Sequence, residues 1–324
     1  MAERNLVNNN VSVLNGESSG MNSTNLVQSN LTRKQPFSNY STKFDGIDYY
    51  TDTGGGFLNG ATTASISVWV NMATKGGTNT SRPFVGNWGT APQRQYLIRH
   101  LNNATSGFQF YVHGPSGPSS TAFVVANTGS SITINNDTWY NLIGTWDGSE
   151  VKIYVNGILR GSQTAISGSL SSSTSPNEIG EYNGTYMDGN ISNAAFWTDI
   201  VLSEDDILNI YNNGITQDLS NFRVPPTNWF PLDESYTYFN GSVMVARDVI
   251  GGGEVDGVNI IQSDIAGNAP GSEASGEGSN LAIADLKGNM YNSDKNAYSI
   301  NMADYADSVT NPANSGRSTE VPSV

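Results

Sequence analysis

Between residues 37 and 200, apolar and polar positions alternate along the chain with a period of two. In the segment SISVWV (65–70), branched apolar residues alternate with Ser and Trp, and the segments 107–113 and 150–155 repeat the pattern. Because successive side chains of a β-strand point to opposite faces, each of these segments is predicted to be a strand. The same pattern predicts further strands at 94–100, 121–126, 131–135, 139–146 and 193–197.

Turn-forming residues separate these segments and predict how they connect. Asn156 and Gly157 lie between two apolar runs. A type I′ hairpin turn needs positive φ at both central positions, which Asn-Gly adopts readily. Asp147 and Gly148 predict a second hairpin just before it. Many short alternating strands joined by Gly, Asn and Ser clusters indicate an all-β fold, an antiparallel sandwich or barrel.

One segment, 203–213, has the period of a helix instead. Ser203 is placed to cap its N-terminus, and three acidic residues follow where the helix dipole favours negative charge. Ile207, Ile210 and Tyr211 share one face. We therefore expect one short helix that closes the sandwich.

Composition divides the chain into three parts. Residues 1–36 form a polar N-terminal arm rich in Asn and Ser, residues 37–214 carry the predicted sandwich, and residues 215–324 contain few large apolar residues. The pair Pro225–Pro226 marks a boundary. We expect the third part to be a small irregular module that buries little surface by itself. The arm and the last residues, 267–324, are expected to order only against neighbouring chains.

Composition and charge exclude several kinds of site and partner. The 324 residues include no Cys and two His, which excludes disulfides, thiolate metal sites and a cage of several histidines. With 15 basic and 29 acidic residues the formal net charge is −14, so electrostatics oppose binding to nucleic acid and to anionic membranes. No apolar run reaches the length of a transmembrane segment, and the N-terminus lacks the apolar stretch of a signal peptide. We expect no nucleic-acid and no membrane partner.

Aromatic residues set among Gly and Asn are candidates for stacking on sugar rings, with Arg and Asn side chains for the hydroxyl groups. Trp88, Tyr182 and Tyr186 have this setting, and Arg94 lies in the same long segment as Trp88. That segment, 76–94, is the longest stretch predicted to be a loop and is the preferred recognition element. The alternative is that each aromatic residue packs to close the end of the sandwich.

Hydrolysis of a glycosidic bond would need two carboxyl groups that flank it, about 5–9.5 Å apart. The nearest candidates are Glu178 and Glu181. Residues three apart on a strand point to opposite faces, so this pair is not expected to converge on one bond. The sequence therefore predicts a protein without enzymatic activity.

Six segments, in their order along the chain, resemble the laminin-G-like, concanavalin A-like lectin/glucanase family. They are KFDGIDYYTD (43–52), ASISVWVN (64–71), WYNLIGTWDGSEVKIYVNGILRG (139–161), NEIGEYNG (177–184), YMDGNISNAAFW (186–197) and LSEDDILNIYNNG (202–214). The resemblance implies an antiparallel jelly-roll β-sandwich over residues 40–214. It does not imply one function, because this fold hosts many.

Members of this family often hold a structural calcium ion near the first and the late Asp-Gly segments. The resemblance therefore implies a calcium site at Asp45, Asp48 and Asp188, since calcium takes about 6–8 oxygen ligands and carboxylates supply them. Ser192 and Asn193 stand where the family frequently has an acidic pair, which departs from that pattern. The alternative is that the aspartates bond to turn amides next to their glycines.

The C-terminal part resembles sequences that accompany such domains in structural proteins of marine bacteriophages, in the stretches 228–235, 283–293 and 297–312. This implies a non-enzymatic virion protein, a capsid decoration or fibre component at the virion surface. Its expected partners are other virion proteins, further copies of itself in a homo-oligomer, and a host surface glycan bound by the lectin-like domain. The alternative is a soluble or cell-surface carbohydrate-binding lectin that is not part of a virion.

Overall fold

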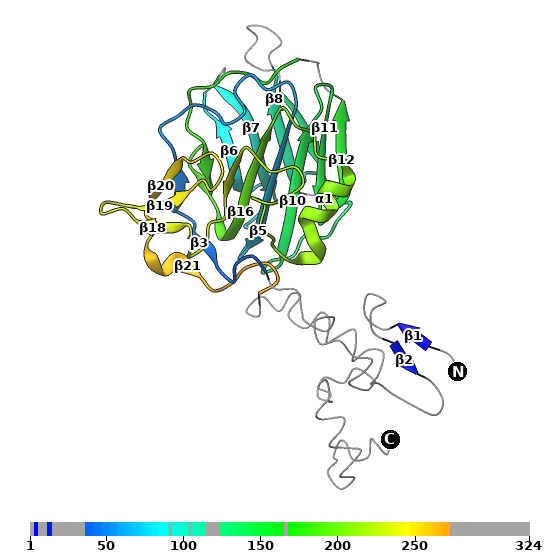
Figure 1. Ribbon diagram of the computed structural model, residues 1–324. Helices are drawn as coiled ribbons and strands as arrows, with labels where there is room; N and C mark the ends of the chain where they lie inside the picture. Colours follow the sequence, from blue (N-terminus) through cyan, green and yellow to red (C-terminus); the bar gives the residue numbers. More distant parts are fainter. Residues whose placement is uncertain are drawn as a thin grey trace. The chain divides into compact units, whose positions relative to one another are not determined.

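The computed structural model describes most of the chain between residues 36 and 272 and the backbone of two short strands near the N-terminus (Figure 1). The described ranges are 36–90, 93–103, 105–114, 123–164 and 168–272. Contacts divide the chain into two units, residues 1–35 with 278–324, and residues 36–277. In the first unit β1 (Glu3–Asn5) pairs with β2 (Ser12–Leu14). All elements discussed below belong to the second unit.

Two antiparallel sheets form a sandwich in the unit of residues 36–277 (Figure 1). The first sheet contains, in spatial order, β12 (Ile158–Thr164), β11 (Glu150–Val155), β10 (Trp139–Trp146), β5 (Ala64–Met72), β16 (Asp188–Thr198), β3 (Ser41–Asp45) and β21 (Ile265–Ala266). One further strand, β17 (Asn228–Phe230), pairs with β16.

The second sheet is longer and carries the pocket described below. It contains, in spatial order, β18 (Thr237–Phe239), β19 (Met244–Arg247), β20 (Glu254–Val258), β4 (Tyr49–Thr51), β13 (Glu178–Ile179), β6 (Ser81–Trp88), β7 (Arg94–Leu101), β8 (Gly107–His113) and β9 (Phe123–Asn127). A small hairpin of β14 (Glu181–Tyr182) and β15 (Thr185–Tyr186) follows β13, and short 3-10 turns lie at η3 (Asn212–Gly214) and η4 (Gln262–Asp264).

The main apolar core lies between the two sheets, where the predicted alternation places it. In β8, Phe108, Phe110 and Val112 are fully buried in this core, and β11 contributes Val151 and Ile153 in the same way. The all-β antiparallel jelly-roll sandwich predicted from the sequence is confirmed.

The outer face of the first sheet is covered as well, by α1 (Glu204–Tyr211) and the chain that follows it. Ser203 caps the helix as predicted, its Oγ accepting from the Asp206 amide at 3.2 Å. Ile207 and Ile210 pack in a second apolar cluster with Trp197 of β16. Both faces of the central strands β5, β10 and β16 are therefore buried. None of the helices in the described ranges has both the length and the hydrophobicity for a membrane crossing.

The sandwich extends beyond residue 214, where the sequence placed its end. β17 pairs with β16, β20 with β4 and β21 with β3, so residues 215–272 add strands to both sheets. Trp229 is fully buried in the outer cluster and Phe230 in the main core. This segment is therefore not the separate module expected from the sequence, because its strands pair with earlier strands and its buried apolar residues complete clusters that those strands begin.

Two local predictions differ from the structure. Residues 81–88, inside the stretch predicted to be a loop, form β6 in the second sheet. Register shifts at Pro83–Val85 and Asn87–Trp88 interrupt the pleat, and these bulges hide the period of two. Residues 131–135, predicted to be a strand, form none; Ile134 still reaches the core, and the amide of Asn135 donates to the Tyr140 hydroxyl at 2.9 Å.

Candidate functional site

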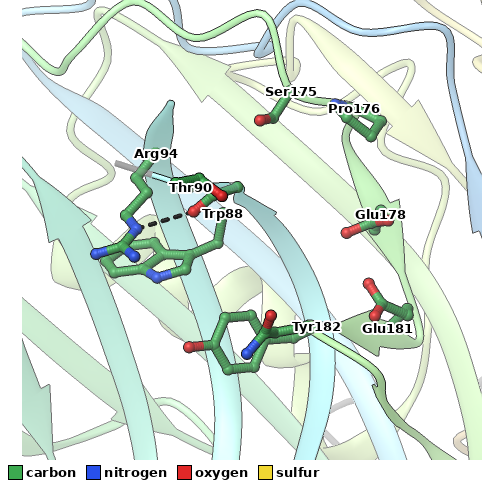
Figure 2. Close-up of a pocket in the computed structure, with 10 residues that line it drawn as sticks. Trp88, Thr90, Arg94, Ser175, Pro176, Glu178, Glu181 and Tyr182 are labelled. Carbon is green, nitrogen blue, oxygen red and sulfur yellow. Dashed lines mark hydrogen bonds between the residues drawn. The ribbon is translucent and has the colours of Figure 1, made fainter. Parts of the chain in front are cut away.

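A pocket of about 310 Å³ lies against the outer face of the second sheet, beside the end of β6 (Figure 2). Its lining combines aromatic, cationic and acidic side chains, which are Trp88, Arg94, Glu178, Glu181, Tyr182 and Asn183. Residues 89–90 and 175–176 complete the wall. Binding pockets for small molecules usually combine apolar surface with a few oriented polar groups, and this pocket has both.

A buried hydrogen-bond network fixes the loop on one side of the pocket. The Asn177 side chain donates to Asp52 Oδ2 at 2.6 Å and accepts from the Tyr96 hydroxyl at 2.7 Å. Asn87 of β6 donates from Nδ2 to the Ser175 carbonyl at 2.7 Å. Because Asn87, Asn177 and Tyr96 are almost fully buried, these bonds form in a low-dielectric environment and hold the loop tightly.

Trp88 and Arg94 form a second wall. The Arg94 Nε donates to the Gly89 carbonyl at 2.9 Å, and the guanidinium carbon lies 5.4 Å from the Trp88 ring centroid (Figure 2). Trp88 is only 9% exposed and packs edge-on against Tyr111, with ring centroids 5.5 Å apart. Trp88 therefore packs on the sheet and lines the pocket at the same time.

Tyr182 reaches the pocket from the hairpin of β14 and β15. Asn183 and Gly184 form its turn with φ of 50° and 75°, as a type I′ turn requires. The Arg99 guanidinium lies 5.6 Å from the Tyr182 ring, and the ring itself is half-buried. The tight turn therefore presents an aromatic ring with part of its surface open to a ligand.

Glu178 and Glu181 lie together on the remaining wall (Figure 2). Burial, together with the neighbouring carboxyl group of Glu181 and the charge of Asp52, raises the pKa of Glu178 to about 9. At neutral pH the Glu178 carboxyl group is therefore protonated.

The sequence argument that these two glutamates point to opposite faces is wrong. Gly180, between them, has φ of 93°, so the chain leaves the pleat and turns Glu181 back toward Glu178. A Cβ atom at Gly180 would lie 2.6 Å from the Phe44 ring, so the packing also requires glycine here. The period-of-two rule holds only while the strand is continuous, and β13 ends at Ile179.

A comparison of sequences assigns the family. The profile of the concanavalin A-like lectin/glucanases superfamily matches residues 45–208, about half of the chain. The chain belongs to this superfamily. Its domain is lectin-like in family and in fold, and the resemblance seen in the sequence is confirmed. A search of curated proteins finds no significant match.

Three solved structures show a distant similarity to the chain. A Bacteroides ovatus protein provisionally assigned as carbohydrate-binding has 14% identity and a TM-score of 0.48, over 70% of this chain and 62% of its own. A heptameric pentraxin from Limulus polyphemus has 14% identity and a TM-score of 0.42, over 67% of this chain and 93% of its own. A Ruminococcus gnavus sialidase module bound to α2,3-sialyllactose has 11% identity and a TM-score of 0.38, over 56% and 98%. These likenesses extend to the fold and no further.

Within this lectin-like domain, the structure brings three of the four predicted sugar-binding residues together. Trp88, Arg94 and Tyr182 all line the pocket. Tyr186 is not among the lining residues; its ring lies 5.9 Å from that of Tyr49, at the far end of the hairpin. The residues converge although residues 81–88 of the segment 76–94 form strand β6 instead of a loop.

The three aspartates of the implied calcium site make other contacts. Asp45 Oδ1 accepts from the Ile47 amide at 3.2 Å, and Asp48 Oδ2 accepts from the Asp45 amide at 3.1 Å. Asp188 lies opposite Asp45 in the β3–β16 pair and has Arg82 at 3.8 Å. Over the ranges that the structure describes, no group of three or more acidic or histidine side chains is arranged to hold a metal ion. These bonds fit the turn-capping alternative, and calcium at this place stays a prediction.

The sequence reasoning did not find the carboxyl pair as part of the pocket or the Asn177 network that positions it. The signal for the pair was present in the segment EIGE, where a glycine between two glutamates permits a break in the strand. Nothing in the sequence pairs Asn177 with Asp52 or Tyr96, which are 125 and 81 positions away.

Proposed function

We propose that the chain is a carbohydrate-binding protein that holds a saccharide in the pocket at Trp88, Arg94 and Tyr182. The observation that supports this most is the convergence of these three residues, chosen from the sequence for sugar binding, on one pocket. A volume of about 310 Å³ is at the lower end of the range of small-molecule sites, about 300–1,000 Å³, which suits one or two sugar rings.

Each wall of the pocket supplies one kind of contact that a sugar needs. Tyr182 offers a ring face for the C–H surface of a pyranose, and Arg94 and Asn183 offer donors for its hydroxyl oxygens. The carboxyl oxygens of Glu178 and Glu181 accept hydrogen bonds from hydroxyl groups. One stacked ring contributes about 1 kcal/mol, so we expect roughly millimolar affinity at a single site and tighter binding by several linked copies.

We propose binding without hydrolysis. Glycosidases place two carboxyl groups about 5–9.5 Å apart, on either side of the bond to be broken. Glu178 and Glu181 lie together on one wall of the pocket, not on opposite sides of the space for a ligand (Figure 2). Incubation of oligosaccharides with the protein should release no reducing ends.

A pair of tyrosines in the same hairpin tests the site. Tyr182→Ala removes a ring from the pocket, whereas Tyr186→Ala removes one beside it. In saturation-transfer NMR titrations with galactose, glucose and their uronic acids, Tyr182→Ala should weaken binding about fivefold, which corresponds to about 1 kcal/mol. Tyr186→Ala should bind as the wild type does. Equal binding by both variants, or no binding of any sugar by the wild type, would contradict the proposal.

The virion role expected from the C-terminal stretches stays a prediction, as do virion partners and a homo-oligomeric state. Residues 228–235 form β17 and the turn after it inside the sandwich. The stretches 283–293 and 297–312 lie outside the described residues. Mass spectrometry of purified phage particles tests this role, and detection of the chain only outside particles would favour the alternative lectin.

A further inference from the structure

We propose that the pocket selects an acidic sugar. The carboxylate of the sugar lies against Arg94, and the Glu178–Glu181 pair accepts hydrogen bonds from the hydroxyl groups of the sugar. This inference rests on the proposed function and names the class of ligand, a uronic acid or another sugar carboxylate. It follows from the way charge is distributed around the pocket.

Arg94 carries a charge that no carboxylate of the described residues balances. The ion pairs found there use Arg82, Lys152, Arg223 and Arg247 as cations. Arg94 is held by one carbonyl and by the Trp88 ring, which orient its guanidinium without neutralising it. In a chain with 29 acidic residues, an oriented and unbalanced guanidinium in a pocket is a binding group for an anion.

Arg99 adds a second such charge on the same face of the sheet. Its Nε donates to Gln109 Oε1 at 3.0 Å and its Nη2 to the Tyr111 hydroxyl at 2.7 Å, both neutral partners. Its guanidinium lies 5.6 Å from the ring of Tyr182, which lines the pocket. The positive charge of Arg94 is therefore reinforced along the sheet.

The two glutamates oppose the binding of a ligand carboxylate less than two negative charges would. Glu178 faces Glu181, Asp52 and Tyr49, and no cation contributes to its pKa, which is raised to about 9. Near pH 7 Glu178 is therefore protonated and adds no negative charge to the pocket. Figure 2 shows the pair on the wall across from Arg94, so a ligand carboxylate and ligand hydroxyls have separate partners.

Three matched sugars test the charge preference on the full chain at pH 7. Galacturonate, galactose and galactosamine differ at one substituent each, and a glucose-based set controls for stereochemistry. We expect at least a tenfold preference for the uronates over the neutral sugars, and a smaller preference at high salt. Equal binding of neutral and acidic sugars, or tighter binding of the amino sugars, would overturn this inference and leave the proposed function standing. No binding of any sugar would overturn both.

Variants of Arg94 test whether this residue causes the preference for acidic sugars. Arg94→Gln should abolish the preference for uronates, so that galacturonate binds this variant no more tightly than galactose does. Arg247→Gln is its control, because Arg247 also stacks on an aromatic ring, at 5.1 Å from that of Tyr238, but has the carboxylate partner Glu254 away from the pocket. If Arg94→Gln does not fold, Arg94→Lys keeps the charge and should retain part of the preference. An unchanged preference in a folded Arg94→Gln protein would overturn the inference.

The pH dependence gives an independent readout. Between pH 7 and 9.5, ionisation of Glu178 adds a negative charge to the pocket, so binding of galacturonate should weaken several-fold while binding of galactose changes little. Glu178→Gln should remove this difference, and Tyr182→Phe controls for ionisation of the Tyr182 hydroxyl. A pH response for galacturonate that persists in Glu178→Gln would contradict the role given to the carboxyl pair.

Discussion

At the scale of single residues, Glu178 lines the candidate site and also lowers the stability of the folded protein as the pH rises. In the unfolded chain this carboxyl ionises near pH 4.5, whereas in the folded protein its pKa is raised to about 9 by burial and by Glu181. Between these values the native state binds one more proton than the unfolded state, so this group makes stability fall as pH rises. An ionisable residue in a pocket whose pKa is shifted this far is typical of a functional site.

At this scale we predict that Glu178→Gln stabilises the protein. The amide keeps the shape of the protonated carboxyl and removes the penalty of its ionisation. The melting temperature of the variant should exceed that of the wild type, and the gain should grow from pH 5 to pH 9. The exposed Glu204→Gln variant serves as the control and should show no such slope. A gain that is constant with pH would contradict the raised pKa of Glu178.

At the scale of elements, α1 and its cap hold the outer cover of the first sheet in place. Ser203 bonds to Asp206 in both directions, and Asp206 in turn pairs with Arg223 of the following segment. We predict that Ser203→Ala lowers the free energy of unfolding by about 1 kcal/mol, because the helix loses its side-chain cap. Urea denaturation measures this, with Asp205→Asn as a control that should cost only a few tenths of a kcal/mol. Equal effects of the two variants would contradict the role of the cap.

The strands could be predicted from the sequence where they are regular. The strands at 64–72, 107–113 and 150–155 have one face in the core and keep the period of two along their whole length. β6 could not be found in the same way, because two bulges and Pro83 disturb its alternation. The Glu178–Glu181 pair was rejected for a related reason, since a positive φ at Gly180 ends the strand between the two glutamates.

At the scale of the whole molecule, the sandwich is a unit that closes only with residues 215–272. Trp229 is fully buried, and its Nε1 donates to Asn193 Oδ1 of β16 at 3.1 Å. The sequence placed the boundary too early, because pairing of β20 with β4 and of β21 with β3 joins segments about 200 positions apart. Such long-range pairings leave no local signal in composition.

We therefore predict that a fragment of residues 36–272 melts cooperatively, whereas a fragment of residues 36–214 does not. The shorter fragment exposes the strand edges of β3, β4 and β16 and the apolar surfaces that Trp229 and Phe230 cover. Calorimetry of both fragments measures this. A cooperative transition of the shorter fragment at the temperature of the longer one would contradict the account of a single sandwich.

The measurement that tests the central claim most directly is chemical-shift mapping of sugar binding on the full chain. Besides the proposed site, the described part of the molecule has an apolar pocket of about 360 Å³ between residues 239 and 262. On titration with galacturonate and galactose, the account predicts saturable shifts of the Trp88 indole and of the amides of Arg94, Tyr182 and Asn183. The amides of the apolar pocket should stay unchanged. Saturable shifts confined to that second pocket, or none at Trp88 and Tyr182, would contradict it.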